Sequence, residues 1–399
     1  MREENMKKVN QQSQTYPISF DPRTGLLRTR TYANAGLSRR QFGKGLAVAG
    51  AIAGMMPGHA KADTTVKYVG WQGYDEGINA DGWFSSQEIT LQPTYVTAGN
   101  EEIIALLQSG GKGNVDFVSP AALYVPFYVE VGLVEPLDLD RIPNYANLFP
   151  EFQGMPALEI DGTHYGTPFI WGSVPLMYNA DVVTETPTSW LDMMDPRWQN
   201  KVAFVADLIG VMPPFMAVAG ETRTPWLANQ ETLDKATELL IKIKKEHALT
   251  VTPGYGELGS LFASGEVVMA PAWEPASVWG GADAVNLKWV MPQEGGLVFV
   301  DNLSIVPGAP EMDTAYEVLN QSLTPEAQAH TANLNSTGTV VRDAVPMIDE
   351  ATKALYPYDD IAGWFEAAGG ITQLWPTQPD GDNVTFDDVT RAWERFLSA

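Results

Sequence analysis

The sequence predicts an α/β fold, and two observations support this class. Short stretches rich in Val, Phe and Ile alternate with longer stretches of helical periodicity, such as residues 230–247. Strands that alternate with helices along a chain imply a parallel or mixed sheet. The chain has 399 residues, and this length favours two domains over one.

The amino-terminal elements begin with a strand at residues 66–70, which runs into a loop of glycines and large aromatic side chains. A helix follows from Asn100, because an Asn cap, acids in the first turn and a closing Gly-Gly mark its two ends. A strand at 115–118 and a helix entry at 121–131 come next. The loop after the first strand lies at its carboxyl end, where open α/β sheets usually bind ligands.

The later elements repeat this order. Residues 230–247 have Leu233, Leu240 and Ile243 on one face, which is typical of an amphipathic helix. The final helix is expected to begin at Thr385, since Thr385 and Asp388 form a capping box. Further strands are expected at 201–205 and 267–270, and further helices from 187, at 258–264 and from 324.

Two apolar stretches, 165–179 and 293–307, each combine a glycine break with a buried type of strand. Asp301 interrupts the second stretch. A carboxylate inside a buried strand is costly unless a partner sits against it. That partner is either a Lys or Arg of the chain, a set of backbone hydrogen bonds, or a positively charged ligand.

These two stretches resemble the two crossing strands of the periplasmic spermidine/putrescine-binding proteins, which are the solute receptors of ABC importers. The matching motifs are Gly-Thr-Pro-Phe-Ile-Trp-Gly at 166–172, and Gly-Gly at 295–296 followed five residues later by Asp301. The resemblance covers most of the chain after residue 63. It implies a two-lobed periplasmic-binding-protein fold whose lobes are joined by crossing hinge strands, with the ligand between the lobes. The implied units are lobe 1 at 63–171 with much of 303–345, lobe 2 at 172–300, and C-terminal helices at 346–399 that pack across both lobes.

Residues 1–62 are interpreted as a cleaved export leader. Ser-Arg-Arg-Gln-Phe-Gly-Lys at 38–44 is a twin-arginine motif, an apolar run of small residues at 46–56 follows it, and Ala-Lys-Ala at 60–62 is a cleavage signal. The alternative is a membrane anchor, but the run is about half the ~20 residues that a span needs. The sequence therefore predicts a periplasmic protein exported through the twin-arginine pathway.

Composition excludes several classes of function. The net charge of −24 disfavours binding to nucleic acid or anionic lipid. With no Cys there is no disulfide, thiol nucleophile or zinc–thiolate site. His-Glu-x-x-His, Gly-x-Ser-x-Gly and P-loop motifs are also absent, so we expect no catalytic residue, no metal and no cofactor.

The resemblance further implies which residues bind the ligand. The family has a Trp and a Tyr spaced as Trp71 and Tyr74, and both line its ligand site; the alternative is that both rings cap the edge of the core. Two acids that contact amines in the family correspond to Asp207 and Gly210, so the second acid is lost here. The family's cleft Trp corresponds to Trp273, and Asn335 replaces one of its aromatic residues. The expected ligand-binding residues are Trp71, Tyr74, Tyr124, Trp171, Asp207, Trp273, Phe299, Asp301 and Asn335.

The predicted function is the capture of a small organic cation, with polyamines first, by a monomeric receptor that delivers it to an ABC permease in the inner membrane. The alternative ligand is a methylated ammonium or sulfonium compound such as a betaine, which an aromatic cage can bind without carboxylates. Loss of an acid at Gly210 gives weight to this alternative. A secreted hydrolase that uses two carboxylates is the alternative from another class.

Overall fold

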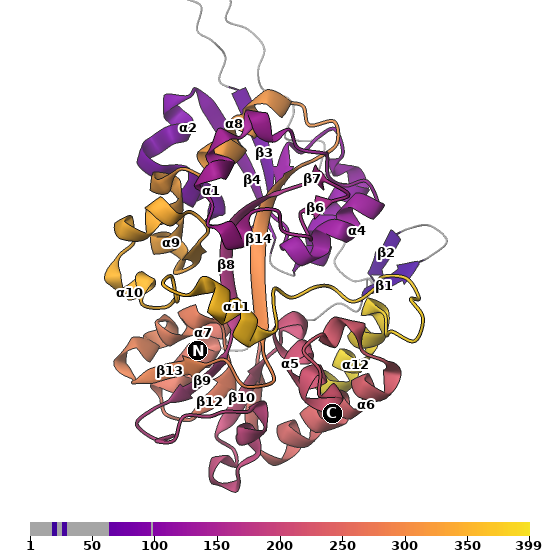
Figure 1. Cartoon of the computed structure of the whole chain (residues 1–399), viewed down its shortest axis with the longest axis vertical. Coiled ribbons are helices and arrows are strands. Elements are labelled where there is room, and N and C mark those ends of the chain that lie inside the picture. The colour runs from indigo at the N-terminus through magenta and orange to yellow at the C-terminus, as the bar shows by residue number, and fades with distance from the viewer. Residues whose placement is uncertain (1–17, 22–25, 30–63, 97–98) are drawn as a thin grey trace, which may run out of the picture.

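The computed structural model describes residues 18–21, 26–29, 64–96 and 99–399. The twin-arginine motif, the apolar run and the cleavage signal lie outside these residues. The described chain forms two lobes, each built on its own sheet with helices around it (Figure 1). A short hairpin of β1 (Ile18–Asp21) and β2 (Leu26–Thr29), which the sequence analysis did not predict, precedes them. In the described part of the chain, no helix is both long and apolar enough to cross a membrane.

Lobe 1 contains a mixed six-stranded sheet. β3 pairs in parallel with β4 and with β5, while β14 runs antiparallel to both β5 and β8. This confirms the mixed sheet that the alternating pattern predicts. In spatial order the strands are β15 (Gly338–Thr339), β8 (Thr167–Val174), β14 (Leu297–Ile305), β5 (Phe117–Val118), β3 (Thr64–Gly70) and β4 (Ile89–Tyr95).

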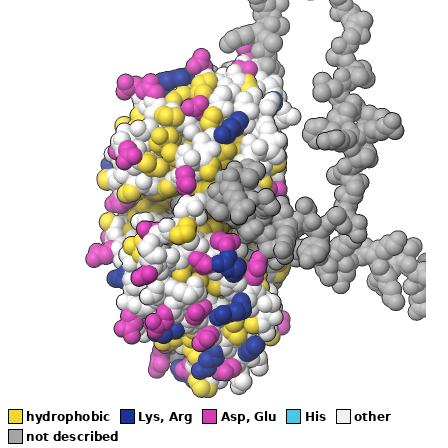
Figure 2. Space-filling view, turned by 90° about the vertical axis from the view of Figure 1, so that its right-hand side faces the viewer, with side chains coloured by type: hydrophobic (Ala, Val, Ile, Leu, Met, Phe, Trp, Pro, Cys, Tyr) yellow, Lys and Arg dark blue, Asp and Glu magenta, His cyan; other side chains and the backbone are white. Residues whose placement is uncertain are grey.

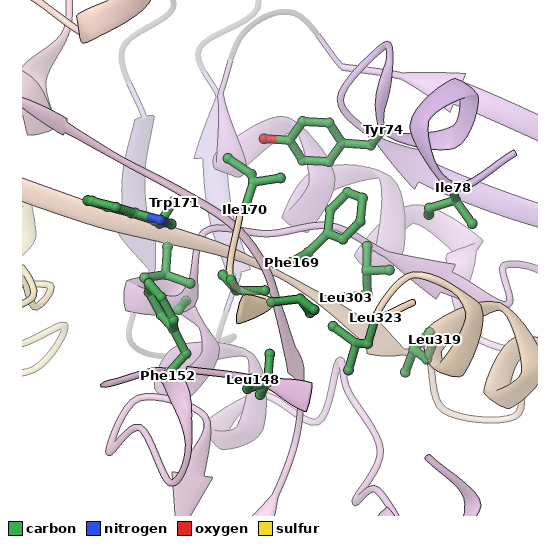
Figure 3. Packing of buried hydrophobic residues seen from close by; sticks show 14 of the residues in the cluster. Tyr74, Ile78, Leu148, Phe152, Phe169, Ile170, Trp171, Leu303, Leu319 and Leu323 are labelled. Atoms are coloured by element: carbon green, nitrogen blue, oxygen red, sulfur yellow. The ribbon is translucent and has the colours of Figure 1, made fainter. Parts of the chain in front are cut away.

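Aromatic and aliphatic side chains from distant parts of the chain fill lobe 1. Figure 3 shows Trp171 beside Phe152, with Phe169 and Ile170 nearer to Tyr74. The core also takes side chains from α11, so part of the C-terminal segment completes this lobe. The helices of lobe 1 are α1 (Tyr74–Ile78), α2 (Trp83–Ser86), α3 (Asn100–Leu106), α4 (Val125–Glu130), α8 (Met312–Gln321), α9 (Pro325–Asn335), α10 (Glu350–Lys353) and α11 (Ile361–Ala368).

Lobe 2 contains a five-stranded sheet in the order β11 (Ala248–Thr252), β10 (Val202–Val205), β12 (Met269–Pro271), β9 (Leu176–Asn179) and β13 (Leu287–Val290). The helix predicted at 230–247 is α6 (Gln230–Glu246), and the predicted capping box of Thr385 and Asp388 opens α12 (Phe386–Ser398). α5 (Leu208–Gly220) was not predicted, because Pro213 and Pro214 lie inside it. The helix expected from 187 is a single 3₁₀ segment, Trp190–Met194. The remaining helix is α7 (Tyr255–Ala263).

The strands β8 and β14 run side by side from one lobe toward the other (Figure 1). Phe299 is opposite Gly172, Val300 is opposite Trp171, and Asp301 is opposite Ile170. Paired residues of antiparallel strands share a face, and successive residues alternate between faces. Phe299 and Asp301 therefore lie on one face of this ribbon, and Trp171 lies on the other.

Candidate functional site

Asp301 is buried in β14, with 7% of its surface exposed. Its Oδ2 accepts a 2.6 Å hydrogen bond from the hydroxyl of Tyr74. Among the described residues, none of the ion pairs includes Asp301, so neither Lys nor Arg neutralises it. Burial raises the pKa of the Asp301 carboxyl to about 7, and the bond from Tyr74 opposes this rise. Of the three alternatives that the sequence leaves open, neither a Lys or Arg partner nor a set of backbone donors is seen for Asp301 among the described residues.

Tyr74 is held in place by its neighbours in lobe 1. Its ring packs edge-on against Phe169 at 5.3 Å between centroids. The loop before it turns at Gly73, whose φ of 90° favours glycine. Asn335 Nδ2 donates to the carbonyl oxygen of Gly73 at 3.2 Å and to that of Thr331 at 3.1 Å. Asn335 thus supports the loop that positions Tyr74.

Three aromatic side chains, Phe299, Trp273 and Tyr255, form a row that begins beside Asp301; we call it the aromatic row. Phe299, on the same face of β14, packs against Trp273 with 5.6 Å between ring centroids. Trp273 also contacts Trp279 at 5.4 Å and Tyr255 at 6.3 Å. The row fits against β8 because residue 172 is glycine: a Cβ there would clash with Trp273 Nε1 and would lie 2.7 Å from Phe299 Cζ.

Asp207 lies at the other end of this aromatic row. It caps the start of α5, where its Oδ1 accepts from the backbone N–H of Gly210 at 3.0 Å. Its Oδ2 accepts a 2.7 Å hydrogen bond from the hydroxyl of Tyr255. A Cβ at Gly210 would collide with Asp207 Oδ2 and would lie 2.9 Å from the Tyr255 hydroxyl. The position that is acidic in the resembled family is thus filled by the side chains of Asp207 and Tyr255.

A further carboxylate, Glu101 of α3, interacts electrostatically with Asp207. Its Oε1 accepts a 2.7 Å hydrogen bond from the hydroxyl of Tyr124. Burial raises the pKa of the Glu101 carboxyl, and the negative charge of Asp207 raises it further. The Tyr124 ring packs edge-on against Phe386 at the start of α12, with 6.1 Å between centroids. Lobes 1 and 2 therefore meet beside these two acids.

Residues 86–357 match the family model described as bacterial extracellular solute-binding protein, which is well over half of the chain. The chain belongs to this family. The resemblance seen in the sequence is thereby confirmed, and the family is one of extracellular solute receptors.

Curated relatives of this solute-binding protein match most of its length. It is 25% identical over 327 residues to the spermidine/putrescine-binding periplasmic protein of Salmonella typhimurium, covering 80% of this chain and 90% of that one. It is 24% identical over 376 residues to the putrescine-binding periplasmic protein of Escherichia coli K12, covering 88% and 96%. Among solved structures, a putative spermidine/putrescine ABC transporter protein from Listeria monocytogenes superposes with a TM-score of 0.67 at 19% identity, covering 84% and 98%. This likeness confirms the two-lobed fold.

Trp171 of the solute-binding protein is not beside the aromatic row. It is fully buried on the opposite face of β8, where it packs against Phe152 and Phe365, and its Nε1 donates to the carbonyl oxygen of Thr339 at 3.0 Å (Figure 3). The expectation that Trp171 lines the ligand site is therefore corrected. Glu274, next to Trp273, also lies away from the row: it is fully buried and both of its oxygens accept from Ser173.

Six of the remaining expected residues interact in pairs: Asp301 with Tyr74, Phe299 with Trp273, and Tyr124 electrostatically with Asp207. Trp71 is partly buried beside the lobe 1 core, and the indole N–H groups of Trp71 and Trp273 have no acceptor among the described residues. The described residues include no group of three or more His, Asp or Glu placed to hold a metal ion.

Sequence reasoning missed Tyr255 and Glu101. Tyr255 lies just beyond the carboxyl end of β11, which ends at Thr252, so the position of ligand sites in α/β sheets could have indicated it. Glu101 was expected only as an acid in the first turn of a helix. No pattern in the sequence shows that this turn lies opposite Asp207.

Proposed function

We propose that this solute-binding protein captures a diamine or longer polyamine between its lobes and delivers it to an ABC permease. The observation that carries the proposal is an acid at each end of one aromatic row. Asp301 stands at one end, next to Phe299 on β14, and Asp207 stands at the other, bonded to Tyr255. A ligand with two ammonium groups joined by methylenes has the same order of chemical groups.

The chemistry of the row fits such a ligand. Ammonium groups form charge-assisted hydrogen bonds to carboxylates, and these bonds are about twice as strong as neutral ones. Aromatic faces attract the cations at about 0.5–2 kcal/mol per contact and also cover the methylenes. The described residues provide no Lys or Arg partner for either acid, so the ligand supplies the missing positive charge.

The names of the relatives support the same class of ligand, since both curated proteins quoted above are periplasmic binders of putrescine or spermidine. We propose Trp71, Tyr74, Tyr255, Trp273 and Phe299 as the aromatic wall of the site, and Asp301 and Asp207 as its acids. Bending is proposed near Gly172 and Val300, at the boundaries of lobe 2 (172–300). Closure of the lobes around the ligand then produces the form that the permease recognises.

Export is part of the proposal, because the relatives are named as periplasmic proteins. Changing Arg39→Lys together with Arg40→Lys removes the address that the twin-arginine machinery reads. The precursor should then accumulate in the cytoplasm. Normal periplasmic yield of the double variant would contradict this route, and mass spectrometry of the exported protein should find Asp63 at its amino terminus.

The binding function is tested by thermal shift followed by calorimetry on the exported protein. The panel contains putrescine, spermidine, butylamine, glycine betaine and a neutral diol of matched length. We expect the diamine and triamine to raise the melting temperature, butylamine to bind more weakly, and the diol not to bind. If glycine betaine bound more strongly than putrescine, the proposed ligand class would be a methylated ammonium compound and not a polyamine.

Solution scattering provides the second arm of the test. Saturating putrescine should reduce the radius of gyration, since the lobes move together around a ligand that contacts both of them. Identical scattering with and without bound putrescine would contradict the closing mechanism while leaving the ligand class intact.

A further inference from the structure

Glu101 and Asp207 belong to opposite lobes, and their charges interact. Glu101 belongs to α3 of lobe 1, and Asp207 caps α5 of lobe 2. Ile209, two residues after Asp207, packs against the lobe 1 cluster that contains Ile103, Ile104 and Tyr124. This packing places the first turn of α5 against the region around α3.

A tyrosine hydroxyl fixes each of these acids in position. Tyr124 donates to Glu101 and Tyr255 donates to Asp207, both at 2.7 Å. Each carboxylate oxygen has room for more than one donor, so both acids can still accept hydrogen bonds from a third group. The ion pairs among the described residues include neither acid.

Two carboxylates in a poorly hydrated place repel each other unless a cation lies between them. Burial raises the pKa of Glu101 and the charge of Asp207 adds to the rise, while both acids also raise the pKa of Tyr124 after the larger effect of its burial. The charges therefore act on the same small volume between the lobes. Bringing the lobes together increases this repulsion, and a bound ammonium group removes it.

We propose that Glu101 is a specificity-determining residue, which together with Asp207 binds the second ammonium group of the ligand across the two lobes. This inference rests on the proposed function, because it concerns one end of the same aromatic row. It also accounts for Gly210. The space beyond Gly210 is occupied by Asp207 and Tyr255, so a second acid cannot stand there without moving them. An acid from lobe 1 takes that place.

The consequence is that closure depends on the charge at this end of the ligand. A monoamine held at Asp301 leaves Glu101 and Asp207 facing each other without a cation, so it stabilises the closed form poorly. A diamine neutralises both ends. Glu101 thus distinguishes ligands with two positive ends from ligands with one.

The test combines Glu101→Gln with a ligand of the same length that lacks the second amine. Calorimetry measures putrescine and 4-amino-1-butanol against the parent, Glu101→Gln and Glu326→Gln. Glu326 is the matched control, because it is an exposed acid in the first turn of α9 in the same lobe. We expect Glu101→Gln to weaken putrescine about 10- to 100-fold, the usual effect of losing a charged hydrogen-bond partner, and to leave the amino alcohol nearly unchanged. The control should behave like the parent with both ligands.

Three outcomes separate the hypotheses. If the parent binds neither amine, the proposed function itself is wrong. If the parent binds putrescine and Glu101→Gln binds it equally well, or weakens both ligands by the same factor, the role of Glu101 is wrong and the function stands. Scattering of the ligand-free proteins provides an independent measurement: Glu101→Gln should be more compact than the parent, and an equal radius of gyration would contradict repulsion between the lobes.

Discussion

The hydroxyl of Tyr74 donates a 2.6 Å hydrogen bond to Oδ2 of Asp301, which joins α1 to a strand 227 residues later in the chain. This bond leaves the second carboxylate oxygen available on the face of β14 that also presents Phe299. An acid whose described partner is a neutral hydroxyl lacks a compensating charge.

The surface carries charges of both signs. Figure 2 shows acidic side chains over both lobes with Lys and Arg among them, and hydrophobic side chains where the lobes meet.

Asp301→Asn keeps the shape of the side chain and removes its charge. We expect it to weaken putrescine binding by about 2–5 kcal/mol, the usual effect of unpairing a buried charge. Calorimetry measures this loss. Asp343→Asn, at an exposed position of lobe 1, is the control and should bind as the parent does. Equal affinity for the parent and Asp301→Asn would show that the acid serves the fold and not the ligand.

Binding should depend on pH through the same residue. Burial raises the pKa of Asp301 to about 7 in the ligand-free protein, and a bound cation favours the ionised carboxylate. The affinity for putrescine should therefore rise as pH increases from about 5 to 7 and level off above that range. Calorimetry in buffers of different ionisation enthalpy measures the protons released on binding. Asp301→Asn should reduce the proton release. A parent that binds without releasing protons at pH 6.5 would contradict this assignment.

Gly172→Ala should damage the aromatic row without removing any ring. The added methyl group clashes with Trp273 Nε1 and with Phe299, so both rings have to move. Overpacking of this kind costs about 1–3 kcal/mol, and we expect putrescine affinity to fall along with stability. Gly256→Ala is the matched control, because nothing lies within 4 Å of its added methyl group. Its affinity should equal that of the parent, and a Gly172→Ala variant with parental affinity would exclude the row from binding.

Glu274→Gln should change how stability depends on pH. Burial raises the pKa of Glu274 from 4.5 to about 8, although Ser173 donates to it from both its hydroxyl and its backbone N–H. A carboxyl group whose pKa is higher in the folded state than in the unfolded state makes its full contribution to folding stability below the unfolded pKa, here about 4.5. This contribution is lost as the pH rises through the folded pKa of about 8. The variant keeps a neutral side chain at every pH, so it should be more stable than the parent at pH 9 by roughly 2–4 kcal/mol. Urea unfolding at pH 5 and pH 9 measures the difference.

An equal pH slope in the parent and in Glu274→Gln would contradict this prediction. Glu366→Gln on α11 does not serve as the control, because α11 donates to Ser173 through Trp364. Glu238→Gln, exposed on α6, is the better choice. It should leave the slope of the parent unchanged.

The sequence predicted the class of fold because its alternation of strands and helices is local. It predicted the capping box of Thr385 and Asp388 for the same reason. Which face of a sheet a strand residue occupies depends on the register with its partner strand. The prediction for Trp171 was wrong for this reason, because Trp171 pairs with Val300 and lies on the face opposite the aromatic row. α5 was missed because its prolines disfavour a helix, yet residues 210–217 are all buried and their tertiary packing holds the helix together.

The same holds for the site: some of its residues could be named from short sequence motifs, and other features depend on contacts between distant residues. Tyr74 and Asp301 could be named from motifs, but the raised pKa of Asp301 follows from burial that no motif encodes. Glu101 was not predicted, because the contact of Tyr124 with Phe386 that joins the lobes there links residues far apart in the sequence. Gly210 was noted as a lost acid, and Asp207 and Tyr255 occupy the space beside it.

The long pairing of β8 with β14 also constrains the order in which the protein folds. Lobe 1 cannot complete its sheet until β14 has been synthesised, by which time the chain of the lobe 2 sheet is already present. Lobe 2 in turn needs Phe396, which is fully buried against Phe204. The core of lobe 1 includes Phe365 and that of lobe 2 includes Phe396, so neither lobe can complete its core until nearly the whole chain has been synthesised.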